Sequence, residues 1–128
     1  MKQENAEKIE LSKELLEQLK ILRGGSLLES HRKMGNDPNL VKAFMDQYNT
    51  TNKCDINIPT KYRELIVMAI GMATGTATTM KVHADLALKN GATVDEVMEV
   101  IRIIFFTCGV SKLLPILETL DIEALSLE

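Results

Sequence analysis

The sequence predicts an all-α protein that folds as a single domain of about six helices over residues 1–128. Apolar residues recur at helical spacings of three and four along the whole chain. No segment sustains the alternation of apolar and polar residues that is typical of a half-buried strand. With 128 residues, of which 45% are hydrophobic, the chain is long enough to bury a core without a disulfide or a metal.

The first half of the chain predicts three helices. An amphipathic helix near the N-terminus ends at Gly24 and Gly25, which favour a helix end. A short helix is expected over residues 27–34. Asp37, as an N-cap followed by proline at the first helical position, begins a third helix that reaches about Asn49. A polar, irregular stretch then leads into the second half.

The second half contains the central feature of the predicted fold, a helical hairpin. A helix that begins at Pro59 or Thr60 is apolar all round after its first turn, which is typical of a buried central helix. Gly75 ends this helix, and a second helix follows to about Asn90. Because the connection is short, we expect the two helices to fold back on each other as an αα-hairpin.

Two further helices complete the prediction. The first is expected to begin after Thr93. Thr93 and Glu96 have the spacing of a capping box, in which the threonine and the glutamate side chains bind each other's backbone N–H. A last helix is expected to begin near Ser111, with Pro115 tolerated in its first turn.

Composition excludes several classes of function. The net charge is −3 and no basic patch is visible, so we expect no nucleic-acid partner. The longest apolar run, residues 65–73, is about half of the ~20 residues that span a bilayer, so no membrane segment is expected. The two cysteines, Cys54 and Cys108, are too few for a disulfide scaffold and fit no zinc spacing. A polar N-terminus and this cysteine usage together favour the reducing cytoplasm.

Glu64 and His83 are the candidates for chemistry. Glu64 is a carboxylate in an otherwise apolar helix, where a buried charge is costly unless it is paired. His83 shares a helical stripe with Thr76 and Thr79, and the hairpin can bring it to Glu64. Spacing alone leaves open a hydrogen-bonded core histidine and a glutamate that only favours the helix dipole.

A set of residues in this region resembles the carboxymuconolactone decarboxylase family, whose superfamily includes the alkylhydroperoxidase D proteins. The resemblance covers about residues 59–120. It is carried by Arg63-Glu64-Leu65-Ile66, Gly75, Thr76, Thr79, His83, the turn Asn90-Gly91-Ala92-Thr93, Glu96 and Gly109. It implies an alkylhydroperoxidase D-like fold and a homo-oligomer, either a trimer or a hexamer.

The sequence departs from the peroxidase branch of that superfamily. In that branch a Cys-x-x-Cys pair precedes the histidine, and Thr76 and Thr79 occupy those two positions here. Threonine hydroxyls have no accessible anion near neutral pH and no sulfur redox chemistry. A peroxiredoxin-like antioxidant activity at this site is therefore disfavoured.

The decarboxylase branch also lacks the cysteine pair, and the sequence is more similar to it. The resemblance implies a carboxy-lyase that needs no cofactor or metal and acts on a small carboxylated lactone or organic acid. Glu64 and His83 would form the catalytic acid–base pair, while Thr76, Thr79 and Arg63 would bind the substrate.

Two alternatives stay open. The first is a thiol-dependent hydroperoxide reductase that uses Cys54 or Cys108, and the second is a non-catalytic, oligomeric module that binds a small molecule. The other histidine, His31, lies in a polar Ser-His-Arg-Lys stretch, so we expect it to be exposed and assign it no function.

Overall fold

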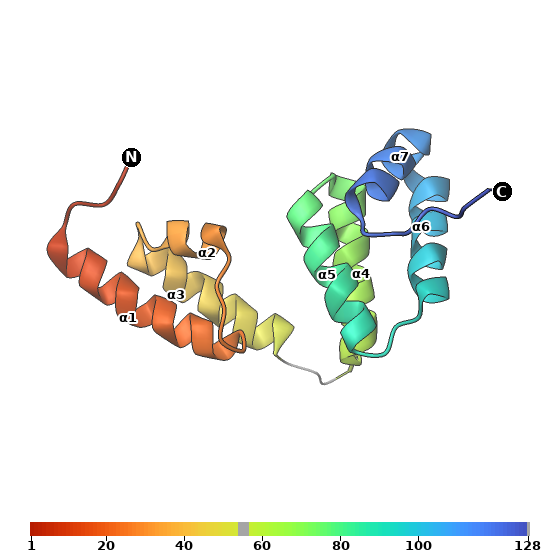
Figure 1. Cartoon of the computed structure of the whole chain (residues 1–128). Helices are drawn as coiled ribbons and strands as arrows, with labels where there is room; N and C mark the ends of the chain where they lie inside the picture. Colours follow the sequence, from red (N-terminus) through yellow and green to blue (C-terminus); the bar gives the residue numbers. More distant parts are fainter. Residues whose placement is uncertain (54–56, 128) are drawn as a thin grey trace. The chain divides into compact units, whose positions relative to one another are not determined.

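The computed structural model describes residues 1–53 and 57–127 (Figure 1). Within these residues the chain forms seven α-helices and one short π-helix, with no strand. The all-α prediction is confirmed, with one helix more than the expected six. The contacts define two compact units, Met1–Asp55 and Ile56–Glu128. A single domain over 1–128 stays a prediction, and each unit is described by itself below.

The N-terminal unit consists of four helical segments, which are α1 (Ala6–Leu22), α2 (Glu29–Met34), α3 (Pro38–Gln47) and the π-helix η1 (Tyr48–Asn52). Asp37 caps α3 as expected, since its carboxylate accepts the N–H of Asn39 at 3.1 Å. The sequence did not predict η1, because a polar segment carries no apolar period from which a helix type could be read.

His31 is buried in this unit, with only 6% of its surface exposed, so the expectation of an exposed side chain is wrong. Its Nδ1 accepts the N–H of Leu28 at 3.0 Å, which satisfies a free donor at the start of α2. Its ring lies 5.2 Å from the ring of Phe44 in α3. The helix therefore turns its histidine inward and leaves the polar neighbours in solvent.

The C-terminal unit contains the expected hairpin, α4 (Thr60–Thr74) and α5 (Ala77–Lys89), followed by α6 (Val94–Cys108) and α7 (Val110–Thr119). Figure 1 shows α4 and α5 side by side. Gly75 ends α4 in the left-handed conformation, with φ of 72°. The N–H groups of Thr76 and Gly75 bond back to the carbonyls of Gly71 and Met72, at 2.8 and 3.3 Å, as in a Schellman motif.

Gly71 allows the two helices of the hairpin to approach closely. A Cβ atom at this position would lie 2.7 Å from the backbone nitrogen of Met80 and 3.0 Å from Cγ2 of Thr79. Such a contact requires one backbone to move. The absence of a side chain at Gly71 thus sets how closely α4 approaches the start of α5.

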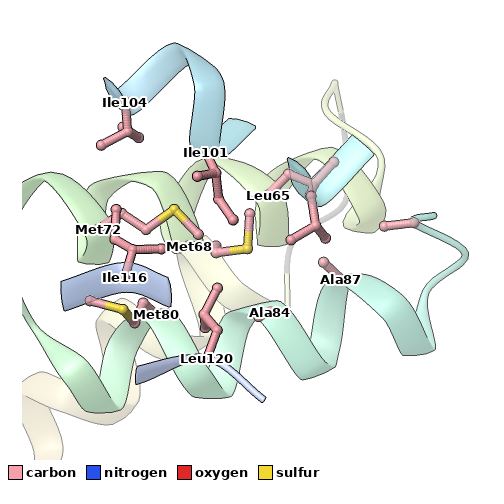
Figure 2. Packing of buried hydrophobic residues seen from close by; sticks show 12 residues of the cluster. Leu65, Met68, Met72, Met80, Ala84, Ala87, Ile101, Ile104, Ile116 and Leu120 are labelled. Carbon is pink, nitrogen blue, oxygen red and sulfur yellow. The ribbon is translucent and has the colours of Figure 1, made fainter. Parts of the chain in front are cut away.

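The core of the unit lies where the hairpin meets α6 and α7 (Figure 2). Three methionines from α4 and α5 fill its centre, and unbranched side chains of this kind adapt to irregular gaps. The buried cluster consists of Leu65, Met68, Met72, Met80, Ala84, Ala87, Ala92, Val97, Ile101, Ile104, Ile116 and Leu120.

The last helix differs from its prediction in one respect. It begins at Val110 rather than near Ser111, so Pro115 lies in its second turn and not in its first. The proline ring has no N–H, and its place in the helix removes one backbone bond. Across the described part of the chain, no helix is both long and apolar enough to cross a membrane.

Candidate functional site

Glu64 and His83 lie on the two facing helices of the hairpin. Glu64 is in the second turn of α4 and is 4% exposed, although it is a carboxylate. His83 lies at the middle of α5, and its side chain is 16% exposed. The packing of α4 against α5 brings the two side chains within hydrogen-bonding distance.

The two side chains bind each other directly. Nδ1 of His83 is 2.5 Å from Oε2 of Glu64. A carboxylate can only accept, so the ring donates from Nδ1 and the bond fixes the ring orientation. The bond leaves Nε2 as the ring nitrogen for proton transfer. Sequence analysis indicated that the hairpin can bring these residues together, and in the structure they are in contact.

Arg63 binds the other oxygen of the same carboxylate. Its Nε and Nη2 lie 3.3 and 3.1 Å from Oε1 of Glu64. The Arg63 side chain is 15% exposed, and its Nη1 is buried without a hydrogen-bond partner among the described residues. Glu64 is therefore held between an arginine and a histidine, which provides the pairing that a buried carboxylate needs.

Thr76 already uses its hydroxyl group within the protein. Its Oγ1 lies 2.9 Å from Oγ1 of Thr74, and the Thr74 hydroxyl points to the carbonyl of Ile70 at 2.8 Å. Since Thr74 has one hydroxyl hydrogen and donates it to Ile70, Thr76 is the donor in the contact between the threonines. Thr76 would have to give up this bond to donate to a substrate.

Thr79 precedes His83 by one helical turn on α5, and it is half-buried. The buried face of α5 is centred on Met80, Ala84 and Ala87. His83 and Thr79 thus lie at the edge of that face and not at its centre. A group at the edge of a packed face combines a fixed orientation with partial access to solvent.

The cysteines contribute nothing to this arrangement in the part of the chain that is described. Cys108 is a free, exposed thiol at the end of α6. Cys54 lies outside the described residues. Over residues 1–53 and 57–127, no group of three or more His, Cys, Asp or Glu side chains could hold a metal ion.

Sequence analysis missed one buried polar residue, Ser12 in α1. Its surface is 2% exposed, and its Oγ has no hydrogen-bond partner among the described residues. The available signal was its spacing, because Ser12, Leu15 and Leu19 follow one another at three and four residues on one buried face.

A buried carboxylate that orients a histidine across a helical hairpin defines a class of site suited to acid–base chemistry. The sequence model of the carboxymuconolactone decarboxylase family matches residues 38–120. The chain belongs to this family. The match begins at α3, earlier than the resemblance over about residues 59–120. No curated protein and no solved structure matches the chain.

Proposed function

We propose that this protein is a cofactor-independent carboxy-lyase that removes CO2 from a small carboxylated lactone or a related organic acid. The observation that carries the proposal is the bond from Nδ1 of His83 to the buried carboxylate of Glu64. Membership of the carboxymuconolactone decarboxylase family supports it.

The proposed reaction needs one proton donor. The bond between the substrate carboxylate carbon and its neighbour breaks, CO2 leaves, and the electron pair enters a conjugated enolate on the substrate. The enolate carbon then takes a proton from Nε2 of His83, which must be in the doubly protonated form, and solvent returns that proton. Glu64 acts as a positioning residue, because Arg63 and His83 occupy its two oxygens.

Arg63 is the proposed partner of a substrate carboxylate. Two of its nitrogens bind Glu64, while the buried Nη1 lacks a partner among the described residues. A guanidinium group can bind carboxylates through a planar pair of N–H donors. Thr79, on the same face of α5 as His83, would supply a hydroxyl donor, and Thr76 would do so only after releasing Thr74.

We also propose that the protein acts in the cytoplasm as a homo-oligomer, either a trimer or a hexamer. A stripe of apolar side chains on α4, formed by Tyr62, Ile66 and Ile70, is 48 to 56% exposed. Phe106 of α6 is 88% exposed. Apolar surface of this kind favours contact with another protein chain.

The test is a survey of CO2 release from small carboxylated lactones and unsaturated organic acids by the full-length protein. The proposal predicts turnover of at least one such acid without added metal or cofactor, and loss of that turnover in His83→Asn. Asp85→Asn, on the exposed side of the same helix, is the matched control and should leave turnover unchanged. If His83→Asn retains the turnover, the proposed role of the histidine is wrong.

A further inference from the structure

The N-terminal unit contains a pocket of about 240 Å³ between its N-terminal segment, α1 and α2. Its lining residues all precede residue 38, where the match to the carboxymuconolactone decarboxylase family begins. The pocket is therefore separate in sequence from every residue of the proposed lyase site.

One wall of the pocket is fixed by hydrogen bonds that involve Gln3 and Asn36. The backbone N–H of Gln3 donates to Oδ1 of Asn36 at 2.7 Å, and Nε2 of Gln3 donates to the backbone carbonyl of Asn36 at 3.0 Å. Oε1 of Gln3 accepts the N–H of Asn5 at 3.0 Å. These bonds hold the segment before α1 against the end of α2, so the wall exists before any ligand binds.

Ser12 is the polar group in the buried part of the pocket lining. It lies beside the apolar side chains of Ile9 and Leu16, which also line the pocket. Its buried hydroxyl has no hydrogen-bond partner among the described residues. Buried hydroxyl groups without a partner are uncommon, because each loses its bonds to water. A ligand atom in the pocket would supply the missing partner after rotation of the serine side chain.

The outer part of the pocket carries positive charge. Lys2, Lys13 and Arg32 line it, and no Asp or Glu is among the lining residues. Lys13 pairs with Glu10 at 3.3 Å on the exposed surface of α1. Arg32 uses Nη1 in a long contact of 3.5 Å to the carbonyl of Leu27. The other N–H groups of its guanidinium make no hydrogen bond among the described residues, so they are available to an anion.

We propose that this pocket binds a small organic carboxylate as a second ligand site of the protein. The carboxylate group lies at the cationic rim, near Arg32, and the apolar part of the ligand lies on Ile9 and Leu16. Ser12 donates its hydroxyl group to the ligand. The apolar side chains of Ile9 and Leu16 favour an organic carboxylate over inorganic phosphate, because phosphate would contact only the cationic side chains at the rim.

The experiment is an NMR titration of the full-length, ¹⁵N-labelled protein with benzoate at constant ionic strength, with inorganic phosphate as the comparison anion. The proposal predicts saturable shifts of the backbone amides in residues 9–16 and 32–36. For nine heavy atoms, a dissociation constant of about 1–10 mM is expected. Phosphate should bind at least several-fold more weakly. Shifts that never saturate, or equal responses to both anions, would overturn the proposal.

Three variants refine the test. Ser12→Ala and Arg32→Gln should each weaken benzoate binding by about 3-fold to 10-fold, the range for one hydrogen bond or one exposed charge. Lys42→Gln removes an exposed charge of α3 outside the pocket and should leave binding unchanged. Ser12→Ala should also keep the thermal midpoint, because it removes an unpaired hydroxyl. Wild-type affinity in both pocket variants would contradict the proposal, whatever the outcome for the lyase reaction.

Discussion

Nδ1 of His83 lies 2.5 Å from Oε2 of Glu64, and this bond joins the two helices of the hairpin at a carboxylate that is 4% exposed. The other oxygen of Glu64 binds Arg63. A single buried carboxylate thus orients the histidine and is itself held by the arginine. The effect of Glu64 on the orientation of the His83 ring and its effect on stability can be tested separately.

Glu64→Gln should remove the fixed orientation of the His83 ring. A glutamine amide can either donate or accept, so it no longer imposes donation from Nδ1. We expect the ¹⁵N signals of the ring to change from one tautomer to a mixture, and the turnover rate to fall by about 10-fold to 100-fold. The thermal midpoint should also decrease, because Arg63 loses its counter-ion in a site where its side chain is 15% exposed.

A structural role alone would lower the midpoint without changing the ring signals. Glu64→Asp provides the comparison, since it keeps the charge and shortens the reach. Partial recovery of turnover in Glu64→Asp relative to Glu64→Gln is the expected result. Unchanged ring signals in Glu64→Gln would show that Glu64 does not position His83.

Gly71→Ala should destabilise the protein. The added Cβ would lie 2.7 Å from the backbone nitrogen of Met80, so α4 and α5 must separate locally. Overpacking of this kind costs about 1–3 kcal/mol, against a gain of about 1 kcal/mol in helix propensity. Urea unfolding measures the net change. Thr78→Ala, at an exposed position of α5, supplies the propensity control and should not destabilise. A stabilised Gly71→Ala variant would show that the close approach is not required.

The burial of His31 predicts that the folded protein loses stability in acid. Burial, together with the nearby Arg23, holds the pKa of His31 below its ordinary value of about 6.5. The unfolded chain therefore binds a proton at a higher pH than the folded chain does. Stability is constant above that ordinary value and decreases as the pH falls below it, towards the lower pKa of the folded state.

His31→Gln should reduce this pH dependence, because glutamine does not titrate and its amide oxygen can still accept the N–H of Leu28. The measurement is the urea midpoint at pH 7.5 and at pH 5.0 in both proteins. The midpoint of the wild type should decrease more between the two conditions. An equal decrease in both proteins would contradict the assignment to His31.

Much of the hairpin could be predicted because its signals are local. Gly75 ends α4, and the apolar run after Glu64 indicates a helix of the core that packs on the helix of His83. The expectation that this helix is buried all round is wrong, because Ile66 and Ile70 are exposed on its other side. The burial of His31 could not be predicted, since its neighbours in sequence are polar and the side of a six-residue helix that packs depends on α3.

The contacts of Arg63 also could not be predicted from the sequence. Adjacent residues of a helix point in different directions, so the contact between Arg63 and Glu64 depends on side-chain torsions that a pattern does not contain. The buried hydroxyl group of Ser12, which has no hydrogen-bond partner among the described residues, is a comparable case. Its place on the buried face follows from spacing, but whether a partner reaches it depends on the packing of α1 against its neighbours.

Replacement of both cysteines tests the thiol-dependent alternative. The double variant Cys54→Ser, Cys108→Ser should retain the turnover of the organic acid, because the proposed proton transfer uses no thiol. Hydroperoxide consumption by the wild type should equal the uncatalysed rate. A hydroperoxide reductase activity that disappears in the double variant would instead favour the redox function.

The most direct test of the central claim is the rate of decarboxylation by His83→Gln, measured together with its thermal midpoint. If Nε2 of His83 delivers the proton, turnover of the active substrate should fall by at least about 100-fold, while the midpoint stays within a few degrees of the wild type. A variant that folds equally well and still decarboxylates at the wild-type rate would contradict the account.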